Sequence, residues 1–197
     1  MTRDLTALFD PRSVAVVGAS NDPAKWGHWL ARGALRGADR RSIFLVNRNG
    51  GEIFGHHAYR SISDIPEPPE LVVVTVPARG FEEAVDGAVA VGAKAIVGIT
   101  GGLGELGGAA REREQALARR VREAGAVLLG PNCLGVFDAD AGIELSSNDF
   151  PPGTTGVISQ SGNVAIELGL LAQEVGLGFS RFASLGNQAD LQAAELV

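Results

Sequence analysis

Short apolar runs recur along this chain, and each is followed by residues that form turns. They occupy residues 13–18, 43–47, 71–76, 95–100 and 127–130. Each run is continuously apolar, which is typical of parallel strands with helices covering both faces. Strands that alternate with helical patterns form right-handed βαβ units. The pattern therefore predicts an α/β fold built on a doubly wound parallel sheet.

Helical periodicity marks the segments between these runs. A first helix is expected to end near Gly37. In a second segment, the apolar residues Phe81, Val85 and Ala88 recur at the spacing of one helix face. A third helix is expected around residues 110–124, with interleaved Arg and Glu on its solvent face.

Composition excludes several classes of protein. Hydrophobic residues make up 45% of the chain and charged residues 20%, so disorder is not expected. The net charge is −6 with no basic stripe, which disfavours a nucleic-acid partner. No leader peptide and no apolar run of about 18 residues is present, so no membrane association is expected. A single cysteine fits a reducing, cytoplasmic setting.

The segment PPGTTG, residues 151–156, interrupts the pattern and is the best candidate for a domain boundary. A strand that leads directly into a helix follows it, then a strand beginning at Phe179. The helix, residues 163–176, is apolar almost all round and is expected to be buried. We therefore expect a first domain in residues 1–148, and in residues 149–197 the incomplete start of a second α/β domain.

The loop after the first strand, GASNDPAKWG, has the geometry of a phosphate site, where free N–H groups and a helix N-terminus face the ligand. It departs from the dinucleotide fingerprint, because Ser20 replaces the second glycine and the next glycine is Gly27. Ser20, Asn21 and Lys25 are available as donors. A tight turn without a ligand is the alternative.

After the second strand, Arg48 occupies the region where NAD sites carry an acidic residue. A guanidinium there favours a phosphate near the adenosine ribose, as in NADP or coenzyme A, unless it is only a solvated charge. The third and fourth strands end in small residues, at VPA (76–78) and ITGG (99–102), at the sheet edge where ligands bind.

Three further groups of residues each have a functional and a structural interpretation. Cys133, in GPNCLG after the fifth strand, is either a nucleophile or, more commonly for a lone cysteine, a small buried hydrophobe. The turn Ser159–Gly162 is either a second anion site at a helix start or an ordinary serine N-cap. His28, His56 and His57 are interpreted as surface imidazoles, with no third ligand for a metal.

Seven segments in order resemble the N-terminal portion of NDP-forming acyl-CoA synthetases, which include ADP-forming acetate–CoA ligases and the α subunit of succinyl-CoA synthetase. They are LFDPRSVAVVGASNDPAKWG, VNRN, VPARGFEE, ITGGLGE, GPNCLG, GVISQSGNVA and SLGNQAD. The resemblance implies a Rossmann-like domain that binds coenzyme A (CoA), followed by the start of a flavodoxin-like domain.

The resemblance also assigns roles to residues. Contacts with CoA are implied at Gly18, Ser20, Asn21, Lys25, Gly27, Asn47, Arg48, Val76, Pro77, Ala78, Ile99, Thr100, Asn132 and Cys133. The last two correspond to the thiol end. The turn of Ser159, Gln160, Ser161 and Gly162 corresponds to the site that holds the phosphate of a phosphohistidine.

Two parts of the family's machinery have no counterpart in this sequence. The phosphorylated histidine lies downstream in the family, and the three histidines here do not match it. The nucleotide-binding ATP-grasp portion is also missing, so ATP and Mg²⁺ would come through other regions or a partner. We therefore expect no catalytic residue in this chain alone. The sequence is compatible with a homo-oligomer.

The expected function is the CoA-binding part of a ligase that converts an acid, CoA and ATP into acyl-CoA, ADP and phosphate. The alternative is a stand-alone module that binds CoA or acyl-CoA for regulation, without catalysis. An NADP-dependent reductase is disfavoured, because the glycine fingerprint is absent and no hydride-transfer pair stands out.

Overall fold

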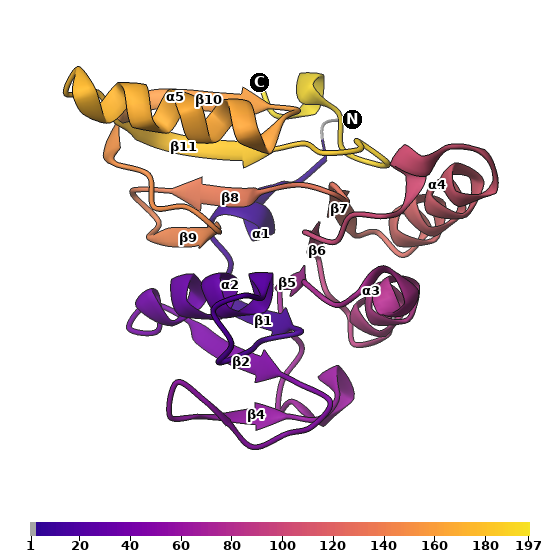
Figure 1. Ribbon diagram of the computed structural model, residues 1–197. Helices are drawn as coiled ribbons and strands as arrows, with labels where there is room; N and C mark the ends of the chain where they lie inside the picture. The colour runs from indigo at the N-terminus through magenta and orange to yellow at the C-terminus, as the bar shows by residue number, and fades with distance from the viewer. Residues whose placement is uncertain (1–2) are drawn as a thin grey trace.

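The computed structural model describes residues 3–197 and contains two sheets, one above the other in Figure 1. The larger has the strand order β3-β4-β2-β1-β5-β6-β7. Its strands are β1 (Ser13–Val17), β2 (Ser42–Val46), β3 (Glu52–Ile53), β4 (His56–Tyr59), β5 (Leu71–Val74), β6 (Ala95–Gly98) and β7 (Val127–Leu129). All neighbours except β3 and β4 pair in parallel, so the α/β fold class is confirmed.

Helices cover both faces of this sheet. They are α1 (Thr6–Phe9), α2 (Trp26–Arg36), α3 (Phe81–Ala90) and α4 (Gly108–Glu123). On one face, α3 and α4 bury Phe81, Val85 and Val121 in a core with β5, β6 and β7. On the other face, α1 and α2 bury Leu8 and Leu30. Short 3₁₀ turns lie at Ile62–Asp64, Ala78–Gly80, Gly104–Leu106 and Ala193–Glu195.

The second sheet has the order β10-β11-β8-β9 and packs over the α1/α2 face of the first. Its strands are β8 (Gly135–Asp138), β9 (Ile143–Ser146), β10 (Pro152–Ser159) and β11 (Phe179–Ser184). Strands β8 and β9 pair antiparallel and were not predicted from the sequence. The segment PPGTTG, interpreted as a boundary, is mostly the first part of β10.

Helix α5 (Gly162–Glu174) packs on the outer face of this second sheet. The prediction that this helix is buried was wrong. Its small residues, Ala165 and Ala172 among them, face a cluster of phenylalanines, while Leu168 and Leu171 on the opposite side are 44% and 56% exposed. A helix that is apolar all round needs a neighbour on each side, and the described residues supply one.

The two sheets are joined by the segment after β11. Residues 187–191 run beside the end of β7, because the N–H groups of Asn187, Ala189 and Leu191 donate to the carbonyls of Pro131, Gly130 and Leu128. A Cβ at Gly186 would lie 2.2 Å from the Pro131 carbonyl oxygen, so a side chain there would not fit.

The carboxylate of Asp190 fixes this segment. It is fully buried and accepts hydrogen bonds from Arg3 at 2.7 Å, from Arg122 at 2.6 Å and from the Leu128 N–H at 2.9 Å. Burial raises the pKa of Asp190, but these hydrogen bonds outweigh it and leave the pKa below its usual value. The ionised carboxylate is therefore the form that the fold requires.

Replacing Asp190 should destabilise the protein strongly. Asp190→Ala leaves two guanidiniums, 24% and 58% exposed, and the Leu128 N–H without their shared acceptor, and a hydrogen bond to a charged group contributes about 1.5–3 kcal/mol. Equilibrium unfolding in urea measures the loss. Asp86→Ala, at an exposed pair with Arg120, is the control and should cost about 0–1 kcal/mol.

The same carboxylate predicts a pH dependence. Because its pKa is lower in the folded than in the unfolded chain, its contribution is complete above the unfolded value of about 3.9 and disappears as pH falls through the folded value. The stability difference between wild type and Asp190→Asn should therefore shrink below about pH 4. A difference that is constant from pH 7 to pH 3 would contradict this role.

Candidate functional site

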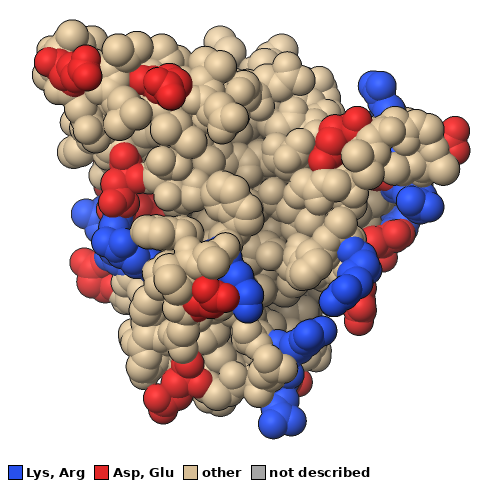
Figure 2. Space-filling model, viewed as in Figure 1, with Lys and Arg blue, Asp and Glu red and all other residues tan. Residues whose placement is uncertain are grey.

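A cavity of about 530 Å³ lies where the carboxyl ends of both sheets meet. Its lining residues are Trp26, Ile99, Gly101, Asn132, Cys133, Leu134, Gln160, Ser161, Gly162, Asn163, Gly186 and Asn187. Each follows the end of a strand or begins a helix, so the cavity is built from the loops that parallel strands bring to one edge. None of the lining residues is charged. Figure 2 shows few charged side chains in the middle of the face that it displays.

The loop between β1 and α2 is closed by contact between two glycines. Gly18 has a φ of +99°, and a Cβ at Gly27 would lie 1.9 Å from the Gly18 carbonyl oxygen. The helix therefore starts directly against the strand end, which a larger residue at position 27 would prevent. Ser20 is buried, and its hydroxyl accepts a hydrogen bond from the Asp22 N–H at 3.0 Å.

Two predicted contact residues hold this loop in place. The Asn21 amide donates to the Glu52 carbonyl and accepts from the Phe54 N–H, both at 2.9 Å, which ties the loop to the β3–β4 hairpin. The Asn47 amide donates to the Ala19 carbonyl at 2.8 Å. Both side chains therefore shape the loop.

The two predicted cationic residues lie outside the cavity lining. Lys25 is 64% exposed, and its ammonium lies 3.5 Å from Asp22. It lines a second, smaller cavity of about 290 Å³, with Ala24, Trp26, Trp29, Ser147 and Asn148. Arg48 is exposed after β2.

The residues that follow β5 and β6 contribute backbone turns and buried side chains to this edge of the sheet. The hydroxyl of Thr100 is buried and donates to the Val76 carbonyl at 2.7 Å. Pro77 and Ala78 begin the turn that leads into α3. Of the contact residues predicted at these strand ends and in the Gly18–Gly27 loop, only Ile99 lines the larger cavity.

The loop after β7 brings Asn132 and Cys133 to the cavity. Asn132 adopts a φ of +57°, and its amide donates to the Asn187 side chain at 3.3 Å. Cys133 is buried with its thiol 3.2 Å from the Gly98 carbonyl, and burial raises its pKa to about 12. The thiol is therefore protonated near neutral pH, which agrees with the interpretation as a small buried hydrophobe.

The turn between β10 and α5 lines the same cavity from the second sheet. Gln160, Ser161 and Gly162 contribute to the lining, whereas Ser159 does not. The Ser161 hydroxyl caps α5 by accepting from the Val164 N–H at 3.4 Å, and the Ser159 hydroxyl donates to the Ser161 carbonyl at 2.8 Å. The serine N-cap is thus present, and the first turn of α5 borders the cavity.

Asn187 and Trp26 were not singled out from the sequence. The Asn187 amide donates to Glu105 and to Glu114, each at 2.8 Å, and so joins the loop after β11 to the loop after β6. Asn187 lies in SLGNQAD and Trp26 in GASNDPAKWG. Both segments carry the family resemblance, so the resemblance was the sequence signal that pointed to these two residues. Gly101 belongs to the segment ITGG (99–102), which the sequence placed at the ligand edge of the sheet, and the remaining unpredicted lining residues are Leu134, Asn163 and Gly186.

The histidines have structural neighbours. His28 lies 3.0 Å from the Asn21 carbonyl and packs edge-on against Trp29 and Phe54, and His57 packs against Tyr59. Across residues 3–197, no group of three or more His, Cys, Asp or Glu side chains is arranged to hold a metal ion. No helix in the same range is long and apolar enough to cross a bilayer.

Comparison with protein families gives two matches along the chain. Residues 12–139 match the family described as CoA binding domain, and residues 152–197 match the family described as succinyl-CoA ligase like flavodoxin domain. The matches follow the order that the sequence resemblance implies.

Curated relatives include two proteins of Pyrococcus furiosus. The chain is 32% identical over 194 residues to the α subunit of acetate–CoA ligase (ADP-forming) II, and 35% identical over 199 residues to that of ligase I. The alignments cover 98% of this chain, and 42% and 43% of the two relatives. This chain therefore spans less than half of their length.

Two solved structures likewise match nearly the whole of this chain. A crystal structure from Pyrococcus horikoshii OT3 matches with a TM-score of 0.94 and 32% identity, over 98% of this chain and 44% of the other. The dinucleotide forming acetyl-coenzyme A synthetase 1 of Ca. Korarchaeum cryptofilum, in complex with phosphate and ADP, matches with a TM-score of 0.91 and 34% identity. That match covers 98% of this chain and 42% of the other.

The buried thiol makes a prediction about reactivity. Because thiolate is the reactive form and burial raises the pKa of Cys133 to about 12, iodoacetamide at pH 7.5 should label the folded protein very slowly. The same reagent in 8 M urea should label it fully, as mass spectrometry would detect. Rapid labelling of the folded chain would instead indicate an accessible, activated cysteine.

Proposed function

This chain belongs to the CoA binding domain family, and from that premise we propose that it is the CoA-binding part of an NDP-forming acyl-CoA ligase. The reaction of the whole enzyme would convert an acid, CoA and ATP into acyl-CoA, ADP and phosphate. The observation that carries the proposal is the shared cavity, in which the loops of the first sheet meet the first turn of α5. A thiol bound by one part and a phosphoryl group bound by the other would meet there.

The distribution of charge supports one orientation of CoA. The cavity lining is uncharged, while Lys25 and Arg48 lie outside it. The phosphates of CoA would lie along the Gly18–Gly27 loop near these cations, with Arg48 at the 3′-phosphate. The uncharged pantetheine arm would cross the ends of β5 and β6, past residues 76–78 and Thr100, and place its thiol near Asn132 and Cys133.

The second sheet supplies the site for the phosphoryl group in this proposal. The hydroxyls of Ser159 and Ser161, the Gln160 amide and the N–H groups at Gly162 surround the N-terminus of α5, where the helix dipole favours an anion. In the whole enzyme, a phosphohistidine would present its phosphate here. The phosphorylated histidine and the residues that bind ATP and Mg²⁺ would belong to regions or a partner that this chain does not include.

We further propose that the first domain spans residues 1–148 and that residues 149–197 begin the flavodoxin-like domain. The second family match, which starts at residue 152, supports this division. The exposed leucines of α5 support it as well, because a further layer of that domain would cover them. An ATP-grasp domain or subunit is the partner that the proposed reaction requires.

Binding of CoA should be selective over NADP, although both carry a phosphate on the adenosine ribose. The first loop lacks the dinucleotide fingerprint, and the cavity beyond it suits an uncharged arm better than a second nucleotide. Calorimetric titration of the chain should give saturable binding of CoA and weaker or no binding of NADP. Equal or tighter binding of NADP would overturn the proposed function.

Lys25 and Arg48 should be separable as contacts of different phosphates. A charge-assisted hydrogen bond contributes about 1.5–3 kcal/mol, so each change to Ala should weaken CoA binding by about 10–150-fold. Arg48→Ala should leave the affinity for dephospho-CoA unchanged, whereas Lys25→Ala should weaken both ligands alike.

Arg119→Ala is the matched control for charge, because Arg119 is exposed on α4, away from the Gly18–Gly27 loop. It should bind CoA like the wild type. Equal losses of CoA and dephospho-CoA affinity in Arg48→Ala would show that Arg48 does not contact the 3′-phosphate.

A further inference from the structure

Trp26 separates the two cavities described above. Among residues 3–197, Trp26 is the one residue that lines both the cavity of about 530 Å³ and the cavity of about 290 Å³. As the first residue of α2, it follows the Lys25 N-cap and is 53% exposed. Because its side chain lines both cavities, Trp26 forms part of the boundary between them, and a smaller residue at position 26 would join them.

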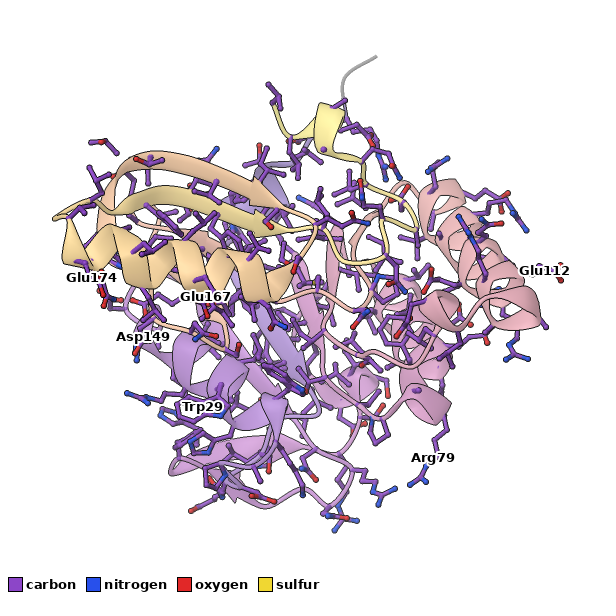
Figure 3. All side chains as sticks on the ribbon, turned by 45° about the horizontal axis from the view of Figure 1, so that its top comes forward. Trp29, Arg79, Glu112, Asp149, Glu167 and Glu174 are labelled. Carbon is purple, nitrogen blue, oxygen red and sulfur yellow. The ribbon has the colours of Figure 1, made fainter. Side chains whose placement is uncertain are left out.

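The second tryptophan has a different position. Trp29 lines only the smaller cavity, and its indole N–H donates to the Pro23 carbonyl at 3.0 Å. Its ring packs against His28 and lies under the guanidinium of Arg32. Trp29 belongs to α2 and lies in Figure 3 on the side of the molecule where Asp149 and Glu167 are labelled. Trp29 is thus a matched control of the same residue type.

The chemistry of the proposed function limits where an acyl group can lie. The carbonyl carbon must lie between the phosphoryl site at Ser161 and the thiol near Asn132, so the rest of the acid must point toward another wall. The large apolar residues of the cavity lining are Trp26, Ile99 and Leu134. Ile99 and Leu134 are each only 6% exposed and belong to hydrophobic cores, whereas Trp26 has open space behind it.

From this geometry we propose that Trp26 determines the size of the acyl group and restricts the enzyme to short aliphatic acids. The larger cavity has to hold the thiol end and the phosphoryl group as well, which leaves room for a short chain in front of the indole. The smaller cavity is the space that a longer chain would enter if position 26 carried a small residue. The proposal rests on the proposed function, because it assigns the acyl end of the same site.

Binding of acyl-CoA thioesters tests the proposal without requiring turnover. Wild type should bind acetyl-CoA at least as tightly as octanoyl-CoA. Trp26→Ala should reverse this preference and favour octanoyl-CoA by about tenfold or more, because several methylene groups become buried in the joined cavities. Trp29→Ala, which enlarges only the smaller cavity, should keep the preference of the wild type.

Tryptophan fluorescence gives a second readout that keeps Trp26 in place. The chain contains two tryptophans, so Trp29→Phe leaves Trp26 as the only reporter and Trp26→Phe leaves Trp29. Acetyl-CoA should change the Trp26 emission beyond the change that CoA causes, while the emission of Trp29 should not distinguish the two ligands. This measurement remains valid even where Trp26→Ala does not fold.

The outcomes separate the two proposals. Failure of the wild type to bind CoA would reject the proposed function itself. Normal binding of CoA with an unchanged acyl preference in Trp26→Ala, or a Trp26 emission that acetyl-CoA and CoA change equally, would reject the role of Trp26 alone. An equal loss of CoA and every acyl-CoA in Trp26→Ala would also reject it, and would place the indole against another part of CoA.

Discussion

The cavity depends on the pairing of residues 187–191 with the end of β7, which Asp190 holds in place. The two sheets also meet through apolar packing over α1 and α2, and through Arg36 of α2, which pairs with Glu144 and Asp149. The carboxylate of Asp190, bound by Arg3, Arg122 and the Leu128 N–H, holds the segment after β11 against the end of β7. As a result, the loop that follows β11 lies against the loop that follows β7.

Close backbone contacts then determine the dimensions of the site. At Gly27 the start of α2 touches the end of β1, and at Gly186 the loop after β11 touches Pro131. A Cβ at either position would overlap a carbonyl oxygen, at 1.9 Å and 2.2 Å. Glycine therefore has a local cause at these two contacts, where loops must approach more closely than side chains allow.

Much of the first sheet could be predicted, because five continuously apolar runs are a local signal, and each is a parallel strand in the structure. Strands β8 and β9 could not, since they owe their pairing to the sheet they join. The exposure of Leu168 on α5 depends in the same way on what packs nearby. At the candidate site, the loops after β6, β7 and β10 line one cavity, while the side chains of Asn21 and Asn47 bind the backbone of neighbouring loops.

The placement of charge links the fold to the kind of ligand that it suits. Parallel strands bring small and uncharged residues to the carboxyl edge, so a bound anion there meets neutral donors and a helix N-terminus. The cations Lys25 and Arg48 lie outside, on loops that Asn21 and Asn47 hold against the first strand. The difference in charge between the neutral cavity and the cationic loops would orient a ligand that has several phosphates at one end and a long uncharged arm at the other. Because charged groups lose hydration on burial, the reverse orientation would cost far more free energy.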